Sequence, residues 1–388
     1  MKNIQLFKPK YRKDEILSEI SECLDSGWTG MGFKTNIFEE KFKEYSGFPH
    51  AHYVSSNTSG LEIVFKILKH SNRWKDGDEI ITTPLTFVSS NHSIVHNNLS
   101  PVFADVDESL CLDLESIKSK ITKKTRAVLF VGIGGNIGQY FEISKFCKSN
   151  GIKIILDAAH MAGTKSTKIV DGIGSSFSQV GWDADAVVFS FQSVKNLPTA
   201  DSGMICFQNG DYDSLARKLS WLGIDKDTFK RTIEKGNYKW DYDVIDHGFK
   251  AHSNSIMASM GLISLKYLDE DNKRRRDICD LYDSGLSDLK KLKIIKHNPL
   301  CESSRHLYQI RVPQREKIFD YLNSHGIYPG VHYKDNTEYE IYSYGRGSCP
   351  NSASFSKEII SLPLHLYLTN EDVEYVIDKI KESCSKFI

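Results

Sequence analysis

The sequence predicts an α/β fold, with a mostly parallel central sheet flanked by helices and a smaller C-terminal α+β domain. Short apolar runs alternate with helical patterns between residues 50 and 210. The apolar runs are nearly continuous, as in parallel strands that are covered on both faces. The alternation weakens after about residue 245. We therefore expect a large α/β domain over residues 1–249 and a small domain over residues 250–388.

Each apolar run of the large domain is short and bounded by polar or turn residues, which predicts a strand. In chain order the predicted strands are Glu79–Thr82, Pro101–Val106, Ala127–Val131, Lys153–Leu156, Ala186–Phe191 and Met204–Phe207. The segments between them are predicted as helices, because their apolar residues recur at helical spacing. This spacing is shown by Leu61, Val64, Phe65 and Leu68.

The small domain begins with a long helical segment, which is predicted from Ser255 to about Leu289. Short strands are predicted near Leu307–Val312. The last helix has Thr369 as its expected N-cap and carries apolar residues on one face.

Charge and cysteine content exclude several classes of protein. The 388 residues include 50 Lys and Arg and 50 Asp and Glu, so no bulk field favours nucleic acid or an anionic membrane. The eight cysteines are scattered, without metal-binding spacing, which indicates reduced thiols and no metal site. No uncharged run approaches the length of a membrane span. We expect a cytoplasmic protein without nucleic-acid or membrane partners.

Three features fall at predicted strand ends, where doubly wound sheets bind their ligands. Asp157 follows the run "KIIL", Lys195 follows "VVFSF", and "SSNTSG" (Ser55–Gly60) precedes a helix. The Ser- and Thr-rich turn offers N–H groups, hydroxyls and a positive dipole end to a phosphate. A carboxylate can keep an aromatic nitrogen protonated, and a desolvated lysine can form a Schiff base with an aldehyde. Together these are the requirements of pyridoxal phosphate.

A competing interpretation starts from "AVLFVGIGGNIG" (Ala127–Gly138), which resembles a dinucleotide-binding fingerprint after a strand. Asp157 would then be the ribose-binding acid. However, the third glycine, Gly138, comes one place late for G-x-G-x-x-G. This interpretation also leaves Lys195 and the serine turn unexplained, so an NAD-dependent dehydrogenase is disfavoured.

Segments in order along nearly the whole chain resemble the DegT-type nucleotide-sugar aminotransferases, pyridoxal-phosphate enzymes of the aspartate-aminotransferase fold (fold type I). "YVSSNTSGLEIVFKIL" resembles their phosphate turn, "LDAAHMAGT" their pyridinium-binding strand end and "FSFQSVKNLPTADSG" their lysine segment. "SGWTGMGFKTNIFEEKF", "TPLTFVSSNHSIVHNNLSPVFADVD", "GFKAHSNSI", "GVHYKDNTEY" and "SLPLHLYLT" are similar to further family segments. The order and spacing of these segments make the resemblance specific.

The resemblance implies catalytic roles at three positions. Lys195 would bind the cofactor's aldehyde and then carry the proton between substrate and cofactor. Asp157 would hold the pyridine nitrogen protonated. His160 would lie near the cofactor's face or its 3′ oxygen.

The resemblance also implies binding residues. Phe87 would stack on the cofactor ring, and Thr58, Ser59 and Ser190 would bind its phosphate. Lys250 would reach the same phosphate from a second subunit, which makes the active site a property of a homodimer. His332, Tyr333 and Asn336, from the segment "GVHYKDNTEY", would bind substrate.

This chain departs from the family pattern at several positions that face substrate in the family. Many members carry His and Tyr at the positions of Gly132 and Gly134, and glycine at the position of Ser202. "KDNTEY" replaces a Pro-Leu-His pattern, and a polar insertion occupies Lys165–Asp183. These departures leave the cofactor chemistry intact and put the usual substrate in question.

The sequence thus predicts an aminotransferase that moves an amino group from glutamate or glutamine to a keto sugar. A nucleotide-linked 4-keto or 3-keto-6-deoxy sugar is expected, for surface polysaccharide or glycoconjugate biosynthesis. A smaller phosphorylated ketone is the alternative acceptor. A sugar 3-dehydratase of the same fold is disfavoured, because a histidine replaces the lysine in those enzymes. Intact Lys195 and Asp157 also argue against a catalytically idle binding protein.

Overall fold

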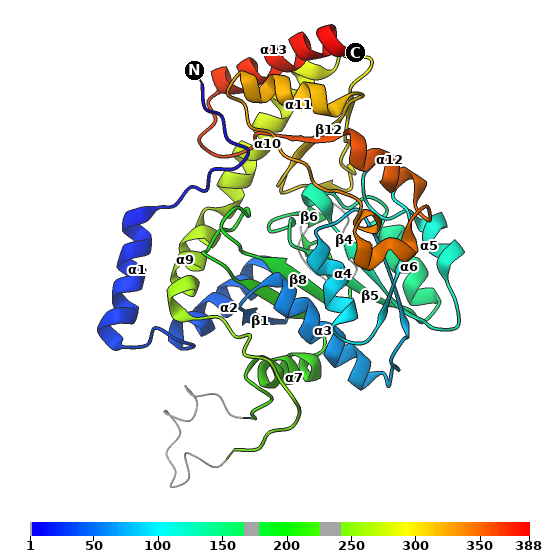
Figure 1. Ribbon diagram of the computed structural model, residues 1–388. Coiled ribbons are helices and arrows are strands. Elements are labelled where there is room, and N and C mark those ends of the chain that lie inside the picture. The colour runs from blue at the N-terminus through cyan, green and yellow to red at the C-terminus, as the bar shows by residue number, and fades with distance from the viewer. Residues whose placement is uncertain (1, 167–177, 226–241) are drawn as a thin grey trace.

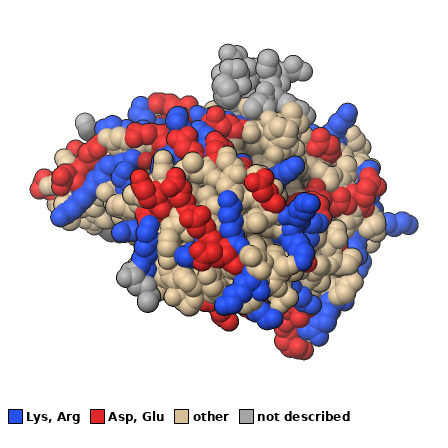
Figure 2. Space-filling model, turned by 90° about the horizontal axis from the view of Figure 1, so that it is seen from above, with Lys and Arg blue, Asp and Glu red and all other residues tan. Residues whose placement is uncertain are grey.

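The computed structural model describes residues 2–166, 178–225 and 242–388 (Figure 1). Residues 167–177, which form the middle of the predicted insertion, lie outside the described residues. Acidic and basic side chains intermingle on the face seen in Figure 2, in keeping with the balanced charge of the sequence. No helix in the described ranges has both the length and the apolar character needed to cross a membrane.

A seven-stranded, mostly parallel sheet forms the centre of the large domain, as predicted. In spatial order it contains β1 (His50–Val54), β9 (Gly203–Phe207), β8 (Ala186–Ser190), β5 (Lys153–Ala158), β4 (Thr125–Val131), β2 (Glu79–Thr82) and β3 (Ser100–Phe103). The strands from β8 to β3 pair in parallel, whereas β9 is antiparallel to both of its neighbours. The carboxyl ends of the parallel strands therefore meet at one edge.

Both faces of this sheet are buried, each against its own apolar cluster. Successive residues of one strand point to opposite faces and therefore belong to different clusters. Leu156 and Val187 lie in one apolar cluster, while Ile155 and Val188 lie in the other. The second cluster is covered by α3 (Asn57–Ser71), whose predicted apolar stripe is fully buried. Among the described residues before residue 250, the other helices are α1 (Lys13–Ser26), α2 (Phe33–Ser46), α4 (Val88–Val95), α5 (Leu114–Lys120), α6 (Tyr140–Ser149) and α7 (Gly210–Ser220). Helix α9 (Ser255–Lys266) follows them, within the range that was predicted for the small domain.

The small domain places helices on a three-stranded antiparallel sheet (Figure 1). The sheet contains β10 (Lys293–Ile294), β12 (Tyr308–Arg311) and β13 (Ile359–Leu362). The helices are α10 (Leu268–Leu286), α11 (Arg315–Ser324), α12 (Pro350–Glu358) and α13 (Asn370–Phe387). The Thr369 side chain accepts a hydrogen bond from the Asp372 N–H, which confirms the predicted N-cap. A third sheet joins β11 (Cys301–Glu302) to β6 (Lys165–Ser166) and β7 (Ser178–Gln179).

The structure differs from the sequence prediction in several elements, of which two concern the frame of the fold. The helical segment predicted over 255–289 is two helices, α9 and α10, which meet at Tyr267. Helix α9 packs on α1 and α2 of the large domain, whereas α10 packs on α13 of the small domain. Strand β1 was not predicted, because His50 and His52 interrupt its apolar run.

Candidate active site

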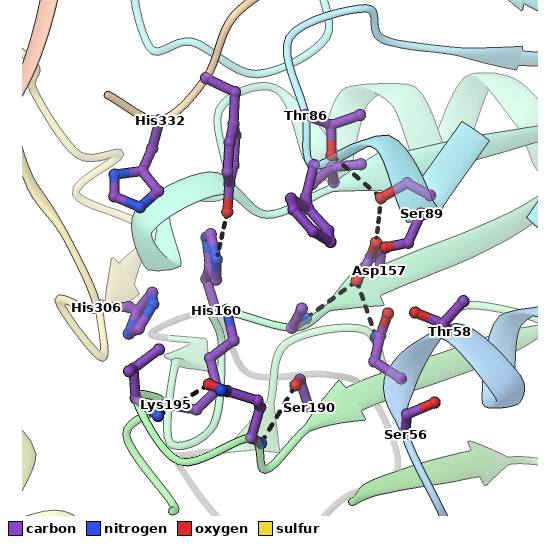
Figure 3. A pocket seen from close by; sticks show the side chains of 18 of the residues that line it. Ser56, Thr58, Thr86, Ser89, Asp157, His160, Ser190, Lys195, His306 and His332 are labelled. Atoms are coloured by element: carbon purple, nitrogen blue, oxygen red, sulfur yellow. Dashed lines mark hydrogen bonds between the residues drawn. The ribbon is translucent and has the colours of Figure 1, made fainter. Parts of the chain in front are cut away.

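A cavity of about 470 Å³ opens at the carboxyl edge of the sheet, where the sequence predicted the site. It is lined by the ends of β5 and β8, the first residues of α3 and α4, and small-domain segments around His306 and His332. Of the predicted site residues, it brings together Thr58, Phe87, Asp157, His160, Ser190, Lys195, His332 and Tyr333. Their arrangement is shown in Figure 3.

Asp157 is held near the end of β5 by neutral hydrogen-bond donors. Its carboxylate accepts from the Ser90 hydroxyl at 2.7 Å and the Asn57 amide at 3.0 Å, and also from the Ala159 N–H at 3.1 Å. The residue is only 3% exposed. Burial raises the pKa of this carboxyl, and the three donors partly offset the rise. A cationic N–H placed against Asp157 would therefore be bound strongly.

Lys195 reaches the same cavity from the segment that follows β8. Backbone hydrogen bonds from Lys195 N–H to Gln192 O and from Thr199 N–H to Phe191 O close this segment into a compact loop. Burial lowers the pKa of the Lys195 ammonium to about 8, against the opposing effect of Asp157. The lowered pKa thus increases the share of neutral amine near physiological pH, and the neutral form is the nucleophile.

One side of the cavity is suited to a phosphate group. Ser56, Thr58 and Ser190 lie together there (Figure 3), at the N-terminus of the 15-residue helix α3. The positive end of the helix dipole favours an anion. Ser59, which was predicted to bind phosphate, does not line the cavity and takes part in the capping box of α3. Its hydroxyl accepts from the Ser56 N–H and its own N–H donates to the Ser56 hydroxyl.

Aromatic and histidine rings form the opposite side of the cavity (Figure 3). The Gly134 N–H donates to Nδ1 of His160, so the neutral ring carries its proton on Nε2, which contacts the Tyr333 hydroxyl at 3.2 Å. The His306 ring lies 4.3 Å from the His160 ring. Burial lowers the pKa of His160 and His306 far below the usual value, and that of His332 to about 4. These three imidazoles are therefore neutral at pH 7.

Besides Ser59, two predicted residues do not line the cavity of this chain. Asn336 is buried and supports the loop before α4: its amide donates to Thr86 O, and its side-chain oxygen accepts from Asn91. Lys250 is exposed, with its Nζ 3.4 Å from the centre of the Trp221 ring. An exposed lysine is available to a second subunit. Phe87, by contrast, lines the cavity and is 59% exposed, so a face of its ring is open to a planar ligand.

Two departures from the family pattern are explained by packing. A Cβ atom at Gly132 would lie 2.0 Å from the sulfur of Met161, which is fully buried. The space beside Gly132 is therefore filled by protein and is not open to substrate. Ser202 is also fully buried, and its hydroxyl contacts those of Tyr53 and Thr199, each at 2.8 Å. It does not face a substrate.

Several cavity residues carry no clear signal in the sequence. Asn57 lies inside the quoted serine turn, but only the folded chain shows that its amide points at Asp157. Ser90 looked like an ordinary helix residue, and its position within the first turn of a helix after a strand was the available signal. His306 and Phe7 come from the small domain and the N-terminal segment, far from any strand end of the large domain. No local signal marks them.

Comparison with known proteins gives one coherent result. A family model described as the DegT/DnrJ/EryC1/StrS aminotransferase family matches residues 10–381. The spore coat polysaccharide biosynthesis protein SpsC of Bacillus subtilis is 30% identical over 96% of this chain and 95% of its own length. The dTDP-4-dehydro-2,3,6-trideoxy-D-glucose 4-aminotransferase of Saccharopolyspora spinosa is 28% identical over 99% of this chain and 98% of its own.

The putative sugar aminotransferase Spr1654 of Streptococcus pneumoniae has a similar structure. Its PMP form superimposes with a TM-score of 0.88 at 28% identity, with both chains fully covered. A PLP form of the same protein matches with a TM-score of 0.86.

The cavity of this chain fits pyridoxal phosphate on its own chemistry. Asp157 is a buried carboxylate whose hydrogen-bond partners are neutral, and a protonated pyridine nitrogen would supply the missing charge. Ser56, Thr58 and Ser190 form a phosphate cradle, Phe87 offers an open ring face, and Lys195 offers an amine of lowered pKa. These residues would hold the cofactor, and the amine would meet its aldehyde.

Proposed function

The chain belongs to the DegT/DnrJ/EryC1/StrS aminotransferase family, and from this premise we propose that it aminates a nucleotide-linked keto sugar. The resemblance found in the sequence is thereby confirmed, and with it pyridoxal phosphate as cofactor and amino transfer as activity. The acceptor we propose is a 4-keto or 3-keto-6-deoxy sugar, and the donor is glutamate or glutamine. The product would enter polysaccharide or glycoconjugate synthesis.

The observation that carries this proposal is the meeting of Lys195 and Asp157 in one cavity with a phosphate cradle. The bound cofactor supplies an aldehyde carbon and an electron-withdrawing ring. In this proposal, Asp157 holds a positively charged N–H group of the cofactor. The start of α3 binds the phosphate, and the small domain excludes water. The Lys195 amine moves the proton, since a pKa of about 8 lets it both accept and donate near neutrality.

Lys195 also separates this proposal from sugar 3-dehydration. An amine that returns to the cofactor in each cycle allows the enzyme to alternate between donor and acceptor, as a ping-pong aminotransferase requires. A histidine in this place could not do so. The spore coat polysaccharide protein and the trideoxyglucose aminotransferase among the relatives support a sugar acceptor.

We place Lys250 in the active site of a second subunit, where its ammonium would contact the cofactor phosphate. Its side chain is exposed and is not part of the cavity lining of its own chain, which supports this assignment. His332 and Tyr333 line the cavity beyond Lys195 and would contact the sugar. Asn336 would act indirectly, by fixing the loop that carries Phe87.

The experiment follows the visible absorption of the cofactor bound at Lys195. Glutamate should abolish this band, and a keto-sugar nucleotide added to the isolated pyridoxamine form should restore it. A panel of thymidine- and uridine-diphosphate keto sugars is compared with a phosphorylated ketone that lacks a nucleotide, and Lys195→Ala serves as the inactive control. Recovery of the band with the phosphorylated ketone alone would reject the nucleotide-linked acceptor.

A further inference from the structure

An N-terminal strap, residues 2–12, crosses from the small domain to the lysine loop and brings one aromatic ring into the cavity. That ring is Phe7, which lies between two anchored ends. It stacks on His306 with ring centres 5.5 Å apart and planes inclined by 10°, and it meets His332 edge-on at 5.7 Å. Phe7 belongs to neither the phosphate cradle nor the Asp157 network, so the chemistry described above does not use it.

The first anchor of the strap is the small domain. The Ile4 N–H donates to Gly326 O at 2.8 Å, and the Ile4 carbonyl accepts from the Tyr328 N–H at 2.9 Å. The Leu6 carbonyl accepts from the Leu364 N–H at 3.1 Å. A Cβ atom at Gly326 would lie 1.8 Å from the Lys2 carbonyl oxygen, so only glycine lets the strap pass at this distance. The path of the strap is therefore built into the small domain.

The second anchor is formed by the lysine loop of the large domain together with the first turn of α10. The Tyr11 hydroxyl donates to Thr199 O at 3.2 Å, within the loop that presents Lys195. Arg12 makes a bidentate ion pair with Asp271 at 2.6 and 2.7 Å, in which both groups are mostly buried. Bidentate charge-assisted pairs fix geometry as well as contributing energy. With both ends held, the position of Phe7 is set by the fold.

We propose that Phe7 is the apolar wall against which the acceptor sugar packs, and that it acts in the acceptor half-reaction alone. The inference rests on the function proposed above. In Figure 3, His306 and His332 lie across the cavity from Ser56, Thr58 and Ser190, so their neighbour Phe7 faces substrate and not the cofactor phosphate.

The apolar surface of Phe7 favours the acceptor sugar over the amino-acid donor. An amino-acid donor presents carboxylates, which find no opposite charge on a benzene ring or on imidazoles that are neutral at pH 7. A deoxygenated sugar ring presents C–H bonds, which pack favourably on the face of an aromatic ring. Phe7 thus determines specificity for the sugar and does not contribute to binding of the amino acid.

The test measures the two half-reactions separately for Phe7→Ala and for the matched strap variant Gln5→Ala, whose side chain is exposed outside the cavity. The donor probe is glutamate, and the acceptor probe is whichever thymidine- or uridine-diphosphate keto sugar the unaltered enzyme accepts. For Phe7→Ala we expect the acceptor KM to rise about tenfold, the size of one aromatic contact, with kcat and the donor half-reaction unchanged. Gln5→Ala should change neither.

A second variant tests the position of Phe7 without changing Phe7 itself. Gly326→Ala should displace the strap and raise the acceptor KM in the same way, while the donor half-reaction reports that the site is still folded. Equal losses in both half-reactions of Phe7→Ala, or no loss in either, would overturn the role of Phe7 and leave the proposed function standing. If the unaltered enzyme accepts no keto-sugar nucleotide, the proposed acceptor is rejected and the role of Phe7 falls with it.

Discussion

Replacing Lys195 with methionine should stabilise the cofactor-free enzyme, because the fold holds this ammonium where it is poorly solvated. Burial lowers the pKa of Lys195 from 10.5 to about 8. At about 1.4 kcal/mol for each pH unit, this difference lowers the free energy of unfolding by at most about 3.5 kcal/mol at pH 7. Burial of Lys195 thus makes its amine reactive and lowers the stability of the fold.

The pH dependence of this effect follows from the direction of the pKa change. Below the pKa of Lys195 in the folded protein, the folded and the unfolded chain both carry the proton. The full cost of burying the charged amine then lowers the stability of the folded protein. Between about pH 8 and 10.5 the folded protein has lost the proton and the unfolded chain has kept it, so stability rises with pH. Removing the charge in Lys195→Met should therefore raise the free energy of unfolding by less than about 1 kcal/mol at pH 10.

Urea denaturation of the cofactor-free proteins at pH 7 and pH 10 measures the difference. Lys118→Met is the matched control, since Lys118 is an exposed lysine paired with Glu115, and it should change stability by less than about 0.5 kcal/mol. A Lys195→Met protein that is less stable than the unaltered enzyme at pH 7 would refute the reasoning. So would an advantage that is equally large at both pH values.

Three further predictions concern residues that support the site and the fold. Ser90→Ala removes a hydrogen bond to the buried Asp157 carboxylate and should weaken cofactor binding by about tenfold in a titration of the cofactor-free enzyme. Gly132→Ala should lower the melting temperature, because the new Cβ collides with Met161, and the double variant with Met161→Ala should recover part of the loss. Thr369→Ala removes the N-cap of α13 and should cost about 1 kcal/mol in urea denaturation without changing cofactor affinity.

Sequence patterns predicted the sheet well, because each strand is a local signal. Strands β2, β3, β4, β5 and β8 are apolar runs with polar ends, and a parallel, doubly covered sheet needs such runs. The direction of β9 could not be predicted, since an apolar run has the same composition in either orientation. The break at Tyr267 was missed for a similar reason: the helical pattern continues across it.

The candidate site was predictable where one residue sits at the end of one strand. Asp157 and Ser190 are of this kind, Lys195 follows in the loop after β8, and all three line the cavity. The rest depends on contacts between distant segments. Ser59 lies one residue beyond Thr58, yet only the capping geometry of α3 shows that its hydroxyl serves the helix. Phe7 enters the cavity because the strap is held at both ends, a fact that no local pattern contains.

The origin of the amino nitrogen in the product tests the central claim most directly. The enzyme is incubated with glutamate that carries the heavy nitrogen isotope and with a nucleotide-linked keto sugar, and the sugar nucleotide is analysed by mass spectrometry. The account predicts that the labelled nitrogen replaces the keto oxygen of the sugar, and that Lys195→Ala transfers none. A sugar nucleotide that loses a hydroxyl group without gaining nitrogen, or glutamate that is converted while the sugar remains unlabelled, would contradict the account.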